Sequence, residues 1–262
     1  MKSHFLRSCF WDSPDLAAFR GARIATVLIL SILLAGVCWF TLAGSLSNMD
    51  AIWRYRSVFW KGWVLTIFIS LASLICSSLL ALLITAARES RFLPLRMLSL
   101  IYVEIIRGSP LLVLILFGWY VVAAQLHLDN RLIVGTLILS GFSAAYLAEM
   151  IRSGLESIAA TQLESAKSIG LTRFQTSRLV IFPQVFRQLL PPLTGQFASL
   201  IKDSSLLSVI SLSEFSFAAG QVNSATFSTF ESFFILGIGY LVLTLPIFYF
   251  SRLLEHRFRY ET

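Results

Sequence analysis

The sequence predicts an all-α protein that crosses a membrane about six times. Of its 262 residues, 56% are hydrophobic and only 13% are charged, and most of the charged residues fall between long apolar stretches. An uncharged stretch of about 17–25 residues is long enough to cross about 30 Å of hydrocarbon as a helix. A soluble domain of this size needs far more polar surface, so this class is excluded.

The first half of the chain is expected to hold three spans. Span one covers Ile24–Ala43 and is interpreted as a retained helix, because no small-residue cleavage site clearly follows it. Span two covers Trp63–Ala87 and ends at a basic turn. Span three lies within residues 98–126, although Glu104 and Arg107 fall in its first third.

The second half is expected to hold three more spans, of which the first is Leu132–Ala148. Residues 149–188 are too polar to span a membrane, and their pattern predicts two or three short amphipathic helices outside the bilayer. Span five covers residues 189–212 and is expected to be broken near a cavity, with a simple kink as the alternative. The residues that would break it are Pro191, Pro192 and Gly195. A polar loop over 213–230 precedes span six, Phe233–Phe250.

The basic residues predict how the chain is oriented. With six spans both termini lie on one side, and the segments on that side carry 15 Lys or Arg against 4 on the other. Because basic loops face the cytoplasm, both termini and residues 149–188 are predicted to be cytoplasmic. The net charge of +7 is therefore attributed to topology. Nucleic acid is not an expected partner, since no basic–aromatic motif stands outside the spans.

Metal, cofactor and nucleotide sites are not expected within this chain. The three cysteines and three histidines are scattered, without the spacing of metal ligands. A Walker A loop requires GxxxxGK[ST], and none of the four lysines follows a glycine. The chain is therefore expected not to be an enzyme, and a transporter with this sequence would need another source of energy.

The most specific pattern lies in residues 148–184, AEMIRSGLESIAATQLESAKSIGLTRFQTSRLVIFPQ. It resembles the cytoplasmic coupling loop of ABC importer permeases, in which Glu-Ala-Ala is followed by three residues, a glycine, nine residues and Ile-x-Leu-Pro. Here Glu164, Ser165 and Ala166 are followed at the same spacing by Gly170 and by residues 180–183. The departures keep size or apolarity: Ser165, Val180 and Phe182 replace Ala, Ile and Leu.

Two further elements resemble the polar amino acid uptake branch of this family, the histidine-, glutamine- and glutamate-type permeases. Residues 107–112, RGSPLL, are similar to its Arg-Gly-Thr-Pro-Leu-Leu element. Residues 200–206, LIKDSSL, are similar to its Leu-Lys-Asp-Thr-Ser-Leu element. The resemblance covers roughly residues 60–255.

The resemblance implies a five-helix importer core at 59–255, with the coupling loop at 149–188. It makes residues 1–58 an addition with one extra helix and 256–262 a cytoplasmic tail. It also implies a bacterial inner membrane location and several partners. These are an ATPase subunit that binds ATP and Mg, a periplasmic solute-binding protein, a second permease subunit and membrane lipid.

Five residues of the coupling loop are expected to pass motion from the ATPase to the spans: Glu164, Ser165, Ala166, Gly170 and Pro183. Small side chains let a partner approach a helix backbone closely. Gly170 can end that helix in a left-handed conformation and turn the chain sharply.

Charged residues within the spans are the candidates for a substrate path. An unpaired charge at mid-membrane costs at least about 2.5–3.5 kcal/mol, so such residues usually face a partner or water. The candidates are Lys202, Asp203, Ser204, Glu104 and Arg107. An alternative is that Glu104 and Arg107, spaced i to i+3, form a structural ion pair.

The predicted function is that of the permease subunit of an ATP-driven importer for a polar amino acid or a related small solute, working by alternating access. An ion-coupled secondary transporter is the alternative. It would need ionisable residues deep in several spans and usually an internal inverted repeat, and neither is clear here.

Overall fold

The computed structural model describes residues 29, 33, 36 and 49–258, and within them every regular element is a helix. The chain divides into two compact units, Met1–Asp50 and Ala51–Thr262, and the fold described below is that of the second unit. The all-α prediction is confirmed for this part of the chain. The expected span Ile24–Ala43 lies almost wholly outside the described residues.

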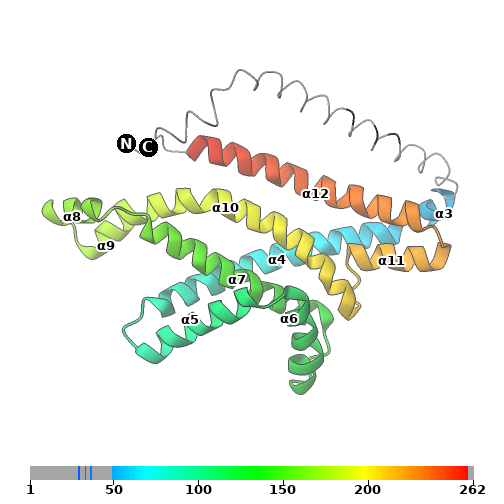
Figure 1. Ribbon diagram of the computed structural model, residues 1–262, viewed down its shortest axis with the longest axis horizontal. Helices are drawn as coiled ribbons and strands as arrows, with labels where there is room; N and C mark the ends of the chain where they lie inside the picture. The colour runs from blue at the N-terminus through cyan, green and yellow to red at the C-terminus, as the bar shows by residue number, and fades with distance from the viewer. Residues whose placement is uncertain (1–28, 30–32, 34–35, 37–48, 259–262) are drawn as a thin grey trace. The chain divides into compact units, whose positions relative to one another are not determined.

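Two long helices pack along each other in this unit: α4 (Arg56–Arg88), which follows the short α3 (Met49–Arg54), and α7 (Arg131–Glu156) (Figure 1). Small side chains line the faces that meet: Ser70, Ser73 and Ser77 on α4, and Ser140, Ser143 and Ala144 on α7, are all buried. Small residues let helix backbones approach closely, which is how helices associate in lipid, where apolar surface alone gives no driving force.

The expected third span is two helices with a sharp corner between them. α5 (Leu93–Gly108) and α6 (Leu111–Phe117) meet at 110°, and a π-helical turn, η2 (Gly118–Ala123), continues α6. The corner is at Ser109 and Pro110 because a residue before proline is forced out of the helical region, and Ser109 is extended. The hydroxyl of Tyr102 donates to the carbonyl of Gly141 at 2.6 Å and ties α5 to α7.

The break expected in span five at Pro191, Pro192 and Gly195 is absent, and that prediction is wrong. α10 (Phe182–Asp203) runs through all three residues and continues as a 3₁₀ turn, η4 (Ser204–Ile210). Proline is tolerated in membrane helices where neighbouring hydroxyls satisfy the backbone. The carbonyls that lose a helical donor to Pro191 and Pro192 lie four residues earlier. Separately, the Pro191 carbonyl accepts hydrogen bonds from the hydroxyls of Thr194 (2.7 Å) and Ser251 of α12 (3.2 Å), and the second of these bonds ties α10 to α12.

The polar loop expected over 213–230 is instead mostly a helix, α11 (Phe215–Thr226), set at 49° to the preceding Arg173–Ile210 segment. Its buried residues are Phe215, Ala218, Ala219 and Val222. They have the i, i+3, i+4, i+7 spacing of one helix face, and burying that face against α4 outweighs the polarity of the rest. α12 (Thr229–Phe258) follows and packs along α10 (Figure 1).

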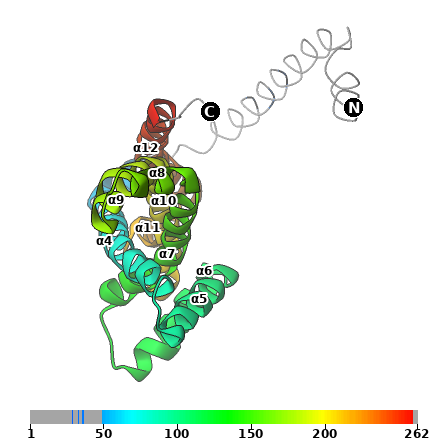
Figure 2. The same cartoon turned by 90° about the vertical axis from the view of Figure 1, so that its left-hand side faces the viewer.

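The helices of the second unit fit a five-span core. Three described helices, α4, α7 and the Thr229–Leu254 part of α12, are long and apolar enough to cross a membrane. The two bent pairs raise the number of candidate spans among the described residues to as many as five. Two short helices, α8 (Ala160–Ser168) and α9 (Arg173–Thr176), lie at one end of this array, and α11 lies at the other (Figures 1 and 2).

Candidate functional site

The segment expected to couple the protein to an ATPase lies on α8, which projects at one end of the helix array (Figure 1). Glu164 and Ser165 are exposed, whereas Ala166 is buried. The exposed face of α8 therefore carries small and acidic side chains, and Ala166 packs the opposite face against the protein. α7 and α10 reach into the 149–188 segment from either side, and α9 runs without a gap toward α10, so only α8 is a separate short helix there.

Gly170 ends α8 in the left-handed conformation that the sequence predicts, with φ of +80°. Its N–H donates to the carbonyl of Lys167 at 2.9 Å, and the N–H of Leu171 donates to that of Ala166 at 3.0 Å. These two bonds form a complete Schellman cap. A Cβ added at Gly170 would meet nothing within 4 Å, so glycine is required here by backbone conformation and not by space.

The return path from α8 to the membrane helices is equally well defined. Thr172 starts α9 with a capping box, because its hydroxyl accepts from the N–H of Gln175 and its own N–H donates to the Gln175 side chain. A π-helical turn, η3 (Ser177–Ile181), leads directly into α10, whose first turn contains Pro183. Proline lacks an N–H and clashes with the carbonyl four residues earlier, and a wider π turn relieves both problems.

The coupling residues are thus brought together around one projecting turn. The side chains of Gln162 on α8 and Gln184 on α10 are joined by a hydrogen bond of 2.9 Å, which ties Glu164–Ala166 to the turn that holds Pro183. Large apolar side chains beside them are open to the outside: Ile169 (76% exposed), Phe174 (72%), Leu179 (62%) and Phe182 (64%). Four large apolar side chains left exposed around one projecting turn indicate a site of interaction with protein or membrane.

The ion pair expected between Glu104 and Arg107 is not formed, and that alternative is wrong. Arg107 instead lies 3.7 Å from Glu149 on α7, with its guanidinium over the ring of Tyr146. The corner after α5 places Arg107 beside α7, where a carboxylate in a neighbouring helix is the nearer partner. Glu104 is exposed and makes no ion pair within the described residues.

Glu149 is the centre of a cluster that sequence reasoning missed. Its carboxylate accepts from Arg88 of α4 at 2.9 Å and from Arg152 of α7 at 2.5 Å, as well as lying near Arg107. Arg152 also bonds Glu156. The cluster joins α4, α5 and α7 at one level. The Glu149/Arg152 spacing of i to i+3 was visible in the sequence, but the two partners from other helices were not.

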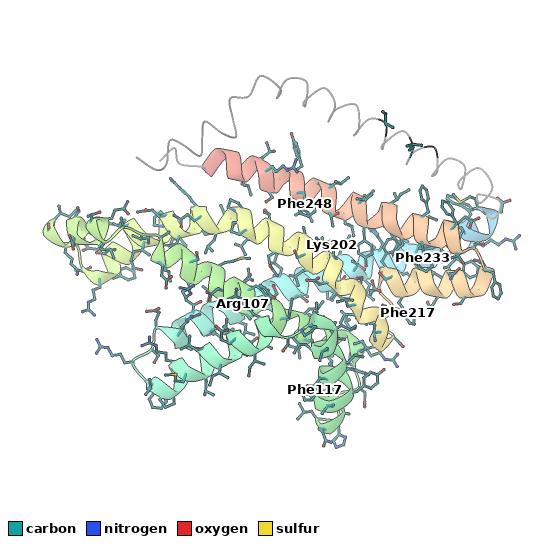
Figure 3. All side chains as sticks on the ribbon, in the orientation of Figure 1. Arg107, Phe117, Lys202, Phe217, Phe233 and Phe248 are labelled. Carbon is teal, nitrogen blue, oxygen red and sulfur yellow. The ribbon has the colours of Figure 1, made fainter. Side chains whose placement is uncertain are left out.

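Lys202, Asp203 and Ser204 lie where α10 passes into η4. Lys202 is exposed and its ammonium lies 5.5 Å from the centre of the Phe248 ring on α12 (Figure 3). Asp203 is half-buried and forms no ion pair or hydrogen bond among the described residues. Ser204 is fully buried and donates to the carbonyl of Ile201 at 2.8 Å, so its hydroxyl is already engaged. Within the described part of the chain, no hydrogen bond or ion pair joins this group to Glu104 or Arg107.

A second missed residue is Glu214, which is completely buried at the start of α11. Its carboxylate accepts from the N–H groups of Ser216 and Phe217, both at 2.8 Å, and from the hydroxyl of Tyr240 on α12 at 3.1 Å. The sequence offered one signal for this helix cap: Glu214 is an acidic residue directly before the periodic apolar residues of α11.

Comparison with known proteins agrees with this geometry. Residues 82–260 match the family described as binding-protein-dependent transport system inner membrane component. The probable glutamine ABC transporter permease protein GlnM of Bacillus subtilis (strain 168) is 35% identical over 212 residues, which cover 80% of this chain and 97% of that protein. The glutamine transport system permease protein GlnP of Escherichia coli (strain K12) is 31% identical over 217 residues, which cover 81% and 98%.

A solved structure shows the same architecture. The fold superposes on a chain of "Crystal structure of an amino acid ABC transporter with histidines" with a TM-score of 0.73 and 31% sequence identity. The match covers 79% of this chain and 96% of that one. The resemblance inferred from the 164–183 pattern is therefore confirmed, and the chain belongs to the family of binding-protein-dependent transport system inner membrane components.

Proposed function

We propose that this chain is the membrane-spanning permease subunit of an ATP-driven importer for a polar amino acid, with glutamine and glutamate as the first substrates to test. The observation that carries the proposal is the capped turn at Gly170, which holds Glu164–Ala166 outside the span array beside an exposed apolar surface. A membrane protein without a docking partner would not need a projecting helix with a rigid cap. The relatives named for glutamine transport support the substrate class.

The energy for import would come from a partner. An ATPase subunit that binds ATP and Mg would dock on α8 and on the exposed residues around it, because a well-defined helix can transmit a push to α7 and α10. A periplasmic solute-binding protein would deliver substrate at the opposite end, and a second permease subunit, identical or related, would complete the path. This chain itself would be a transport component and not an enzyme, with both termini and α8 in the cytoplasm.

Glu104, Lys202 and Asp203 would line or adjoin the substrate path. All three are charged residues of the span region, and none of them forms a salt bridge among the described residues. Charges of this kind at membrane depth are stabilised by water or by a charged substrate. Arg107 would act with them only when its contact with Glu149 opens. Ser204 would support the wall of the path without contacting the substrate, because its buried hydroxyl already donates to the carbonyl of Ile201.

Replacing Asp203 by asparagine tests this assignment. An amino acid substrate carries an ammonium group, and asparagine keeps an acceptor oxygen but loses the negative charge. Weakening such a hydrogen bond by about 1 kcal/mol should raise the KM of uptake about fivefold. Asp129→Asn removes the same charge from an exposed loop and should leave the KM unchanged. Equal KM values for the two variants would remove Asp203 from the path.

Uptake by proteoliposomes tests the function itself. The chain is reconstituted with the ATPase subunit, the binding protein and, where the second permease subunit is a related chain, that subunit of its own system, and radiolabelled glutamine is supplied outside. We expect uptake only when ATP and all of these components are present. Uptake that runs on a proton or sodium gradient without the ATPase would replace the proposal with a secondary transporter.

A further inference from the structure

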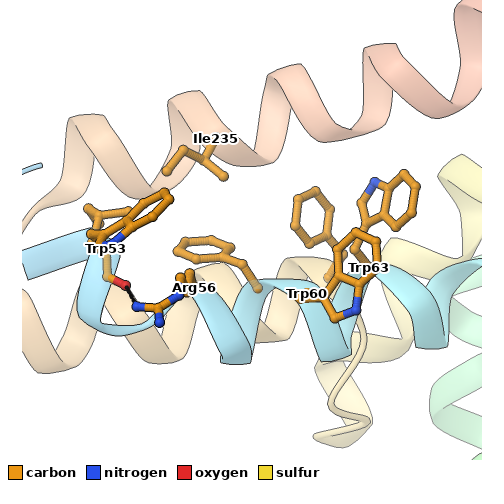
Figure 4. Close-up of a pocket in the computed structure, with 8 residues that line it drawn as sticks. Trp53, Arg56, Trp60, Trp63 and Ile235 are labelled. Carbon is orange, nitrogen blue, oxygen red and sulfur yellow. Dashed lines mark hydrogen bonds between the residues drawn. The ribbon is translucent and has the colours of Figure 1, made fainter.

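An aromatic pocket lies at the end of the molecule opposite α8, between α3, α4, α11 and α12 (Figure 4). Its volume is about 310 Å³, and its wall is almost entirely apolar. Its lining includes Trp53, Arg56, Phe59, Trp60, Trp63 and Ile235. A polar amino acid would lose its water here without gaining polar partners. We propose that this pocket binds one chain of an anionic phospholipid, whose phosphate is held by Arg56.

The pocket lies at the level where lipid headgroups begin. The uncharged run of α4 extends from Gly62 to Ala87, and the pocket is built around the helix turns just before it. The rings of Trp60 and Trp63 stack with their centres 5.3 Å apart, and the Trp63 indole N–H donates to the carbonyl of Gly239 on α12 at 3.2 Å. Tryptophans with one end apolar and one end polar concentrate at this depth in membrane proteins.

The pocket opens outward and not into the protein. Trp53 is 69% exposed and Trp60 is 63% exposed, whereas Phe59 behind them is buried. Exposed apolar side chains at the depth of the headgroups contact lipid where no protein covers them, so the groove between these rings and Ile235 is accessible to an acyl chain.

Arg56 supplies the charge that selects the headgroup. Its guanidinium donates to the carbonyl of Trp53 at 3.1 Å and lies 5.3 Å from the centre of that ring. It forms no ion pair among the described residues, so most of its donors have no protein partner. Over residues 49–61, which include α3 and the start of α4, Arg54, Arg56 and Lys61 stand against a single acidic residue, Asp50. The planar guanidinium matches two phosphate oxygens at once, and the surplus positive charge favours an anionic lipid.

Fluorescence quenching tests the site. Trp11, Trp39 and Trp119 are replaced by phenylalanine, so that the emission comes from Trp53, Trp60 and Trp63. The protein is placed in vesicles of phosphatidylcholine with a minor fraction of phosphatidylglycerol, and bromine is carried on the chains of one lipid or the other. We expect phosphatidylglycerol to be preferred near these tryptophans about fivefold, the effect of one basic residue at a membrane surface.

Two variants decide between a built site and general attraction. Arg56→Gln should abolish the preference for phosphatidylglycerol, whereas Lys61→Gln, which removes the same charge at the same end of α4 but outside the pocket, should retain most of it. Arg56 is exposed, so its removal should not disturb folding, which circular dichroism checks. Equal quenching by both lipids, or an unchanged preference in Arg56→Gln, would overturn the proposal. If neither brominated lipid quenches the tryptophan emission, protein covers the pocket, and this outcome would also overturn the proposal. The proposal does not depend on the transported solute.

Discussion

Replacing Glu214 by alanine should lower the free energy of unfolding by about 4 kcal/mol, the largest loss of stability that we expect from a single substitution in this chain. The carboxylate is fully buried and accepts from two backbone N–H groups at the start of α11. Losing a helix cap costs about 0.5–2 kcal/mol, and each buried donor left without an acceptor costs about 1–3 kcal/mol. Thermal unfolding in detergent, followed by circular dichroism, measures the loss.

The surroundings of Glu214 explain why water cannot replace it. Tyr240 donates to the same carboxylate, and the N–H of Phe215 is already bonded to the hydroxyl of Thr66 on α4 at 3.1 Å. The approach of α4 is close, because a Cβ on Gly62 would lie 2.8 Å from that of Ala218. Glu214 therefore joins α4, α11 and α12, and its loss should loosen the end of the molecule that contains the aromatic pocket.

Two matched variants separate the cap from a general effect of charge. Glu89→Ala removes an exposed carboxylate after α4 and should change stability by less than about 0.5 kcal/mol. Glu214→Gln keeps one oxygen acceptor at nearly the same size and should lose less than the alanine variant. Equal unfolding temperatures for Glu214→Ala and Glu89→Ala would show that α11 does not depend on this carboxylate.

The contrast between α8 and α11 shows what the sequence alone can predict. Gly170 and its spacing from Glu164 were sufficient to predict a helix that ends in a left-handed turn, because that geometry depends on neighbouring residues only. The 213–230 segment was expected to be a loop because its composition is polar, although Phe215, Ala218 and Val222 already followed a helical period. For the secondary structure of this segment, the spacing of the apolar residues was a better predictor than the polar composition.

Partners that come from distant parts of the chain could not be predicted. Arg107 was given a neighbour on its own helix, but the corner at Pro110 directs α5 toward α7, where Glu149 is available. Pro191 and Pro192 indicated a broken span, but α10 runs through both residues and packs along α12, where Ser251 donates to the Pro191 carbonyl. Tertiary packing chose the partner of Arg107 and holds the proline-containing helix against α12, so local rules for ion pairs and helix breaks gave the wrong answer.

Replacing Gly170 by valine should weaken binding of the ATPase subunit about tenfold and reduce ATP-driven uptake correspondingly. A residue with a Cβ pays about 1–2 kcal/mol in the left-handed region, and about 1.4 kcal/mol corresponds to a tenfold change in affinity. A β-branched residue is disfavoured there more than most. The cap bonds to Lys167 and Ala166 would weaken with it, so α8 would lose the defined end that a docking partner needs.

Asparagine at the same position is the control that isolates backbone conformation. Asparagine tolerates the left-handed region far better than valine does, and the space around Gly170 is open, so Gly170→Asn should keep most of the affinity. Binding is measured with the permease in lipid nanodiscs, and the unfolding temperature of each variant checks that the spans remain intact.

If valine and asparagine lower the affinity equally, added bulk at the interface is responsible and the capped turn is not the coupling element. If neither lowers it, the ATPase docks elsewhere. Only a loss specific to valine ties coupling to the left-handed turn, because the two side chains differ little in size and strongly in the backbone conformations that they permit.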